Sequence, residues 1–594
     1  MRGAPATPDP GAESRDAFGP QEGREVVLGR REFLAASAAA AAGYLIAPRA
    51  ASADVLAPGR RVETIRGHVS RPGYVVPPGH TLRFDPARNT TLEVSGNVVV
   101  NGTLEMRPEP NVTHTLRFVG VDESAFVGSG MDPIASDVGL WVMGRGRLDA
   151  VGSPKRAWAR VEGDVEAGAT TVTLDVDPKG WDVGDRIVIT PTAPVTDPRF
   201  WEQYDETRIS RIEGRTVTLA SPTAHAHPSC TLPDGRVMGA EVLDLTRNVR
   251  IQGTRAGRSH IYIRSSRPQT IEFVEMAYLG PQKDDGEFVL GRWALHFHHA
   301  RNGSRGSLVR GCVVHHCGSR AFVPHASHGI AMRNCIVHDS VGEAFWWDRD
   351  VPEDNTTDIL WDRCVASKVQ KTGFMMNGGG DNLARDCVSV GGFGYNTSGG
   401  AFLWPGGLAM PDDFAATTCV AHNNDAQGIR VWQNGQDSSR IDGFISYRND
   451  SAGVHGAYGN KFDYRNCVFT QNLTPYAFHA LSAAFQDCTF DASGGAYAAN
   501  TGKHAVEGQD NVLTGCRFIG ATEAGLLFAA DPTEHGEKFT LIDCGFDGGN
   551  EFWMDSNVPS ASYVVVRDET RGNLTLRRAD QPGTFRPEWN ASVT

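Results

Sequence analysis

Histidines gather in one short part of this sequence, and their spacing is its first sign of chemistry. Seven of the 19 histidines lie between residues 291 and 333. Within this stretch, residues 294–298 align with residues 321–325: a small residue, a large apolar residue and, three positions later, a histidine. The seven are His296, His298, His299, His315, His316, His325 and His328.

The same pattern continues in residues 344–348 and 373–377, which places four repeats in register. If the large apolar residues point inward, strand alternation turns the residue three positions later outward. On strands stacked about 4.8 Å apart, these outward residues form one column. The column contains His298, His325, Asp348 and Asn377, and His296 and Trp346 share its face two residues away.

Two imidazoles and a carboxylate in one column support two kinds of chemistry. His298 and His325 could exchange protons as general acid and base, with Asp348 orienting His325 and setting its pKa. Alternatively, the same three side chains could ligate a divalent metal ion, since this is a common ligand set. A polar ladder that only stabilises stacked strands is the structural alternative.

Arginines surround these histidines. Residues 291–333 hold six arginines and no aspartate or glutamate, although the chain as a whole has a net charge of −13. A basic block on an acidic protein favours an anionic ligand, and planar guanidinium groups suit carboxylates or sulfates. We therefore expect Arg292, Arg320 and Arg333 to hold carboxylates. The alternative is that the arginines pair with acidic residues on neighbouring repeats.

Tryptophans accompany the column. By parity Trp347 and Trp404 point inward, whereas Trp346 is the exposed candidate for stacking on a sugar ring. Arg430 falls in the outward column of Trp346 and would extend an anion-binding track.

Short strands in a repeat must position these residues. Ten segments share a turn residue, then Cys or Phe, then a short apolar run, at spacings of 21 to 32 residues. This period predicts a right-handed parallel β-helix, while the Leu-rich pattern of a horseshoe repeat is absent. Nine of the eleven cysteines share one column and are expected to form an inward ladder of small hydrophobes rather than disulfides. They are Cys312, Cys335, Cys364, Cys387, Cys419, Cys467, Cys488, Cys516 and Cys544.

The chain therefore reads as all-β, with several regions. Residues 54–235 contain short strands and glycine turns and form an all-β domain. Residues 236–560 form the β-helix, and residues 561–594 form a β tail or cap. Whether the first of these regions continues the β-helix is left open by the sequence.

The N-terminus predicts export. Residues 29–34 read GRREFL, a twin-arginine pattern, and an apolar stretch over 33–47 leads to a small-residue cleavage site at 51–53. The stretch is too short to span a membrane, which needs about 20 residues, and no other apolar run is long enough. The acidic net charge argues against a nucleic-acid partner.

Two sets of motifs resemble known families. GWDVGDRIVITPT (180–192), ETRISRI (206–212), GRTVTL (214–219) and His225 resemble the eight-glycine domain, an all-β module. RWALHFHH (292–299), SRAFVPHASHG (319–329) and VGEAFWWDRD (341–350) resemble the β-helix core of the cell-migration-inducing, hyaluronan-binding family, which includes a transmembrane hyaluronidase. The resemblance covers about residues 80–400.

This resemblance implies a protein that binds or depolymerises hyaluronan-like anionic glycans. It carries over to His296, His298, Arg320, His325 and Asp348. The chain departs from the family pattern at residues 294–295, 324–326 and 343, which leaves its own activity and substrate open.

Taken together, the sequence predicts an exported β-helix protein that binds and cleaves an acidic, uronate-containing polysaccharide. Hydrolysis and β-elimination use similar residues, so both stay open. A glycan-binding module without catalysis and a structural metal-binding β-helix are the alternatives.

Overall fold

The computed structural model describes most of the chain between residues 54 and 585. The predicted signal segment 1–53 and the predicted site residues Trp347, Asp348 and Asn377 lie outside the described residues. The described ranges are 54–55, 61–346, 355–376, 380–393, 400–404, 414–431, 439–456, 462–473, 483–500, 510–528, 538–547, 550–554, 563–568, 572–577 and 583–585.

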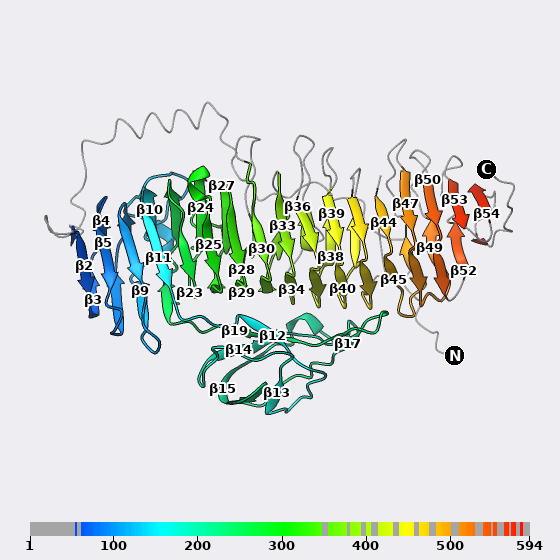
Figure 1. The fold of residues 1–594 in the computed structure, drawn as a ribbon, viewed down its shortest axis with the longest axis horizontal. Helices are drawn as coiled ribbons and strands as arrows, with labels where there is room; N and C mark the ends of the chain where they lie inside the picture. The colour runs from blue at the N-terminus through cyan, green and yellow to red at the C-terminus, as the bar shows by residue number, and fades with distance from the viewer. Residues whose placement is uncertain are drawn as a thin grey trace, which may run out of the picture. The chain divides into compact units, whose positions relative to one another are not determined.

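Three parallel sheets build a right-handed β-helix, confirming the predicted fold class (Figure 1). Each turn of the chain adds one strand to sheet B, then one to sheet C, then one to sheet A. Helical structure among the described residues is limited to three 3-10 turns, η1 (Glu123–Ala125), η2 (Phe200–Glu202) and η3 (Asn302–Ser304). No described helix is long and apolar enough to cross a membrane.

Sheet A carries the histidines. Its strands are β1 (Asp54–Val55), β4 (Tyr74–Val76), β7 (Val98–Val100), β10 (Leu140–Gly144), β21 (Ile261–Ser265), β24 (Leu295–Arg301), β27 (Phe322–Ser327), β32 (Phe374–Met375), β35 (Gly400–Trp404), β38 (Gln427–Val431) and β41 (Val454–Gly456). Phe345 bridges β27 to β32. Near the C-terminal end, β46 (Tyr497–Asn500), β49 (Ala524–Phe528), β52 (Asn550–Met554) and β55 (Gly583–Phe585) form a further sheet.

Sheets B and C run through nearly every turn. Sheet B consists of β2 (Val62–Ile65), β5 (Thr81–Phe84), β8 (Thr103–Met106), β11 (Arg147–Val151), β22 (Thr270–Glu272), β25 (Ser307–Arg310), β28 (Ile330–Arg333), β30 (Leu360–Asp362), β33 (Asn382–Arg385), β36 (Phe414–Thr417), β39 (Ser439–Asp442), β42 (Phe462–Arg465), β44 (Ala484–Gln486), β47 (Asp510–Thr514), β50 (Lys538–Ile542), β53 (Tyr563–Asp568) and β54 (Gly572–Arg577). Sheet C consists of β3 (Gly67–Arg71), β6 (Thr90–Val94), β9 (His114–Phe118), β20 (Val249–Gln252), β23 (Val274–Ala277), β26 (Val313–Cys317), β29 (Ile336–Ser340), β31 (Val365–Val369), β34 (Val388–Val390), β37 (Val420–His422), β40 (Ile445–Tyr447), β43 (Val468–Thr470), β45 (Thr489–Asp491), β48 (Arg517–Ile519) and β51 (Gly545–Asp547).

The corner between sheets B and C explains the turn residue of the repeat. In all ten repeats the residue before the Cys or Phe has a positive φ, between 50° at Asp543 and 64° at Gly443. Glycine, asparagine and aspartate adopt this left-handed conformation at low cost, which accounts for their frequency at the position.

The interior confirms both predicted columns. The nine column cysteines are unbridged and face the core, and their thiols donate to backbone carbonyls; Cys335 Sγ, for example, lies 3.5 Å from Val309 O of the preceding turn. Beside them Phe322, Phe345, Phe374 and Phe402 stack with ring centroids 4.6–5.2 Å apart. These stacked rings fix the register of sheet A.

The β-helix begins earlier than the predicted boundary at residue 236. Strands β2 to β11, over residues 62–151, already lie in the three parallel sheets and share the core with the later turns. These early turns lack the cysteine column, so the repeat did not reveal them. The described parts of the predicted tail, 561–594, are strands: β53 continues sheet B, β54 pairs antiparallel with β53, and β55 pairs antiparallel with β52.

An antiparallel insert occupies the remaining part of region 54–235. It enters at the corner between β11 and β20, where Ser153 N donates to Asn248 Oδ1 at 2.8 Å. Its strands are β12 (Trp158–Arg160), β13 (Thr171–Thr173), β14 (Arg186–Ile189), β15 (Asp205–Glu213), β16 (Thr216–Leu219) and β19 (Glu241–Asp244), with a hairpin of β17 (Cys230–Thr231) and β18 (Val237–Met238).

The insert packs on the outer surface of sheet C (Figure 1). Its apolar residues cover an outward stripe made by the first apolar residue of successive sheet C strands. Tyr204 seals the contact, since its hydroxyl donates to Val390 O at 3.0 Å. The stripe consists of Val313, Ile336, Val365, Val388, Val420 and Ile445.

Candidate functional site

The predicted histidine column forms where β24 and β27 lie side by side in sheet A. Leu295 pairs with Phe322 and His298 with His325, in the register expected from the repeat. Both apolar residues are fully buried, so alternation turns the two histidines to the outer face. The predicted juxtaposition of His298 and His325 is confirmed.

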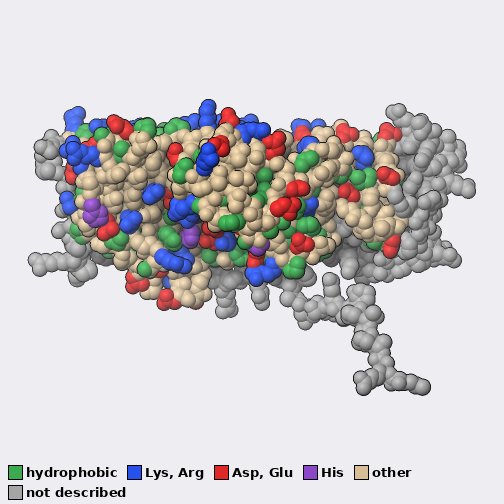
Figure 2. All heavy atoms as spheres, turned by 90° about the horizontal axis from the view of Figure 1, so that it is seen from below, with side chains coloured by type: hydrophobic (Ala, Val, Ile, Leu, Met, Phe, Trp, Pro, Cys, Tyr) green, Lys and Arg blue, Asp and Glu red, His purple; other side chains and the backbone are tan. Residues whose placement is uncertain are grey.

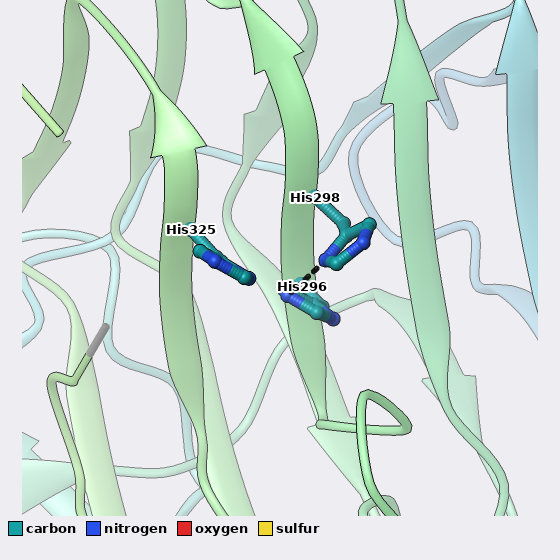
Figure 3. A group of neighbouring side chains, drawn as sticks. All are labelled: His296, His298 and His325. Atoms are coloured by element: carbon teal, nitrogen blue, oxygen red, sulfur yellow. Dashed lines mark hydrogen bonds between the residues drawn. The ribbon is translucent and has the colours of Figure 1, made fainter. Parts of the chain in front are cut away.

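His296 joins them and completes a cluster of three imidazoles (Figure 3). One ring nitrogen from each of His296, His298 and His325 lies within 4.8 Å of the other two. His298 Nδ1 and His296 Nε2 are 3.3 Å apart. We refer to these three residues as the imidazole cluster.

The backbone fixes the tautomer of His296. Its Nδ1 lies 2.9 Å from Gly291 O, a carbonyl that can only accept, so Nδ1 carries the proton. The lone pair is then on Nε2, which faces His298. His296 is 1% exposed, so this orientation is held by the surrounding packing.

Burial keeps two of the three imidazoles, those of His296 and His298, neutral. It lowers the pKa of His296 well below its ordinary value, and the neighbouring His325 adds to the effect. Burial, together with His296 and His325, also lowers the pKa of His298 strongly. The two side chains are therefore uncharged near neutral pH, with lone pairs that can accept a proton or bind a cation.

An aromatic wall adjoins the cluster on the preceding turns of sheet A. Tyr262 pairs in register with His296, and its ring centroid lies 5.1 Å from that of His298. Trp141, one turn earlier, packs on Tyr262 with centroids 4.9 Å apart. The buried Tyr262 hydroxyl has no hydrogen-bond partner within the described part of the chain. Tyr262 could not be found from the repeat, because its turn lacks the column cysteine.

The arginines pair with acidic residues of other turns, which is the alternative to ligand binding that the sequence left open. Arg292 is fully buried, with its Nε 2.8 Å from Asp137 Oδ2 and its guanidinium over Trp141. The expectation that it holds a substrate carboxylate is therefore wrong, since Asp137 and the aromatic wall enclose it.

The other arginines of the block also meet acidic residues on neighbouring turns. Arg320 pairs with Glu343 at 2.9 Å, and Arg333 lies 3.7 Å from Asp362 on sheet B, away from the histidine column. Arg305 and Arg310 pair with Asp358 and Glu272. On the face in Figure 2, basic and acidic side chains are likewise interspersed.

Trp346 is buried, contrary to its predicted exposure. It is 7% exposed because the Arg320 guanidinium lies 3.6 Å from its ring centroid and Trp293 packs at 6.1 Å. Trp404 is fully buried, as parity predicted. Arg430 follows Leu403 in register and is 5% exposed; burial lowers its pKa to about 10. It is therefore not an open anion-binding track.

Exposed guanidinium groups occur elsewhere around the cluster. Arg264 directly follows Ile263, which pairs with Phe297, so the register places it beside His298. Arg301 ends β24, and its Nη2 lies 3.2 Å from His299 Nδ1. Neither was singled out from the sequence; the repeat register of the earlier turns would have been needed to find Arg264.

Of the predicted metal ligands, His298 and His325 lie together, whereas Asp348, like the predicted binding residue Asn377, lies outside the described residues. Among the described residues, the third side chain placed to join the two histidines at a metal ion is His296. The predicted roles of these residues in catalysis and binding stay predictions.

Comparisons with known proteins match this region. A family model for the CEMIP beta-helix matches residues 257–378, which include the imidazole cluster. Mouse fibrocystin-L is 27% identical over 249 residues, covering 34% of this chain and 6% of its own length. The mouse cell migration-inducing and hyaluronan-binding protein is 26% identical over 247 residues, covering 37% and 17%. Human cell surface hyaluronidase CEMIP2 is 27% identical over 220 residues, covering 32% and 15%.

The chain thus spans about a sixth or less of the length of these relatives. Among solved structures, the Agl-KA catalytic domain aligns with a TM-score of 0.32 and 9% identity, covering 70% of this chain and 98% of that one. The fold assignment therefore rests on the strand register of the chain itself. In the β-helix that carries the imidazole cluster, this protein resembles the CEMIP family.

Proposed function

We propose that this protein is an exported carbohydrate-active β-helix that binds and depolymerises an acidic, uronate-containing polysaccharide at the imidazole cluster. The observation that carries the proposal is the cluster itself, three imidazoles gathered on the outer face of sheet A. The family match covers the same turns. Two relatives are named as hyaluronan-binding and as a cell surface hyaluronidase, which supports a glycan of this class.

Proton transfer is the chemistry proposed for the cluster. A neutral His298 can accept a proton from water or from a sugar carbon, and His325 in its protonated form, beside it on β27, can donate one to the leaving oxygen. We propose that Asp348 orients His325, as the sequence predicts. A hydrolase and a lyase would both use such a pair.

Substrate charge would be met by arginines other than those first predicted. Arg264 and Arg301 are both exposed; Arg264 lies beside His298 on the neighbouring strand β21, and Arg301 is the last residue of β24. Exposed guanidinium groups can bind a uronate carboxylate through two parallel hydrogen bonds. We also propose that the insert is the eight-glycine module and that residues 1–53 direct twin-arginine export.

The test measures the length of the polysaccharide after incubation with the protein. Purified protein is incubated with hyaluronan and other uronate-containing polysaccharides, and product size is measured by size-exclusion chromatography with light scattering. The wild type should shorten one of them. His298→Gln should lose at least about 100-fold in rate, the usual contribution of a positioned acid or base.

His68→Gln is the matched control, because His68 is exposed on β3, far along the chain from the cluster. Ultraviolet absorbance of the products separates elimination, which leaves a double bond, from hydrolysis. If the wild type binds polymer but never shortens it, the protein is a glycan-binding module and the catalytic proposal is wrong.

A further inference from the structure

The geometry of the imidazole cluster points to a resident divalent transition-metal ion. We propose that His296, His298 and His325 together ligate one such ion, of the Zn²⁺ type, with a fourth position open to water or to a carboxylate oxygen. This replaces the two-histidine, one-aspartate set predicted from the sequence. Ligation would occupy the lone pairs of His298 and His325, so it stands as an alternative to the direct proton transfer proposed above, and metal binding itself does not require the glycan function.

Distance is the first argument. Zinc binds imidazole nitrogen at about 2.0–2.1 Å, so two nitrogens at the tetrahedral angle lie about 3.4 Å apart. His298 Nδ1 and His296 Nε2 are 3.3 Å apart. The third nitrogen, from His325, is within 4.8 Å of both, a gap that side-chain rotation can reduce.

Orientation is the second argument. Histidine ligands commonly donate the other ring N–H to a backbone carbonyl, which fixes the tautomer and aims the lone pair. His296 does this through Gly291 O at 2.9 Å. This contact holds a buried ring in the ligating orientation.

Ligand type decides the class of ion. Three imidazoles suit Zn²⁺, Cu²⁺, Ni²⁺ or Co²⁺, whereas Mg²⁺ and Ca²⁺ prefer oxygen ligands. The eleven cysteines do not compete for the same site, because ten are buried in the protein interior and Cys544 ends the ladder at the far turns. Zinc sites with three protein ligands and an open fourth position are typical of catalytic rather than structural zinc.

Charge indicates what would occupy the fourth position. Imidazoles bind a metal ion as neutral ligands, so three of them leave the charge of the ion uncompensated, and exposed Arg264 adds a further positive charge beside His298. The Tyr262 hydroxyl, next to His296 and His298, has no hydrogen-bond partner among the described residues and is a donor available to an oxygen ligand. An anionic oxygen is therefore favoured, and this part of the inference rests on the proposed function, since a uronate would supply it.

The experiment uses metal alone. Full-length protein is stripped with a chelator at fixed neutral pH and titrated with Zn²⁺ by calorimetry, and with Co²⁺ by visible absorption. One Zn²⁺ per chain is expected, and Co²⁺ should give the intense visible band of a four-coordinate ion without a thiolate charge-transfer band. No stoichiometric binding by the wild type, or a thiolate spectrum, would overturn the proposal.

Variants locate the site. His298→Gln, at a partly exposed position, and His325→Gln should each weaken Zn²⁺ binding at least about 100-fold. Loss of a residue that only hydrogen-bonds to a metal ligand typically costs about 10–100-fold in affinity. His68→Gln should bind as the wild type does. If a variant fails to fold, the Co²⁺ spectrum of the wild type still decides.

Activity separates the two proposals. Depolymerisation by a wild type that shows no stoichiometric Zn²⁺ binding would refute the metal inference and leave the glycan function standing. Stoichiometric metal binding without depolymerisation would do the reverse.

Discussion

Arg320 shows how a residue singled out for ligand binding can instead be structural. Its guanidinium lies over Trp346 at 3.6 Å and over Trp293 at 4.7 Å from the ring centroids, and pairs with Glu343 on the next turn. The planar group therefore links three turns of sheet A beside the imidazole cluster. A cation over an aromatic ring contributes about 0.5–2 kcal/mol, more when it is desolvated.

Arg320→Ala is expected to lower the free energy of unfolding by about 2 kcal/mol, because it removes the stacking and leaves Glu343 buried without its guanidinium. Arg320→Lys should recover only part of this, since an ammonium cannot stack and pair at once. Thermal and urea unfolding measure the effect. Arg333→Ala is the control; its side chain is 44% exposed, so a change below about 1 kcal/mol is expected. Equal losses in both variants would refute the structural role of Arg320.

At the scale of strands and sheets, the sequence predicted which residues lie side by side on neighbouring strands better than it predicted which side chains are buried. His298 beside His325 followed from a repeat length and a two-residue alternation, which are local properties. The burial of Arg292 and Trp346 could not be predicted in the same way, because Asp137 and Arg320 approach them from other turns. The early turns were missed because leucine, valine and phenylalanine fill their core in place of the cysteine column.

The contact between the insert and sheet C includes a buried acid. Glu241 of β19 is fully buried and accepts from Thr190 Oγ1 at 2.9 Å, with Arg160 Nε at 3.0 Å and His422 Nε2 of β37 at 2.9 Å. Burial alone would raise the pKa of Glu241, but His422 and Arg160 together hold it at about 2, below its ordinary 4.5. The carboxylate therefore stabilises the folded state as an anion.

Glu241→Gln is expected to destabilise the protein by about 3 kcal/mol near neutral pH, since it removes the buried carboxylate that half-buried Arg160 and buried His422 contact. Because the folded-state pKa is depressed, this stability is present in full above about pH 4.5 and is lost as pH falls through about 2. The difference in melting temperature between wild type and variant should therefore narrow below pH 4.5. The exposed Glu213→Gln serves as control. A difference that stays constant with pH would contradict the ionised pair.

At the scale of the whole β-helix, the insert shields an apolar surface of sheet C from solvent. It hides an outward stripe of valine and isoleucine that runs along six strands of sheet C. The two ends of the insert meet at Ser153 and Asn248, whose side chains hydrogen-bond at 3.0 Å. The parallel sheets continue past the insertion point without a break in register.

Replacing residues 154–247 by a short Gly-Ser linker should therefore preserve the β-helix but cause self-association, because the uncovered stripe is a contiguous apolar patch. Circular dichroism should remain that of a β protein, while light scattering and dye binding should both increase. Adding Ile336→Thr, Val365→Thr and Val388→Thr to the deletion should restore a monomer. A deletion variant that is monomeric and binds no dye would show that the insert is not needed as a cover.

The position of the insert also delays the synthesis of the strand that pairs with β9. Strand β9 ends at Phe118, and its partner in sheet C, β20, begins only at Val249. At roughly 5–20 residues per second, the partner leaves the ribosome roughly 7 to 26 seconds later. During that interval the first turns present an unpaired edge, which is the surface most open to wrong strand pairing. The nascent chain must therefore fold its insert, or be held by a chaperone, before the β-helix can grow past its first turns.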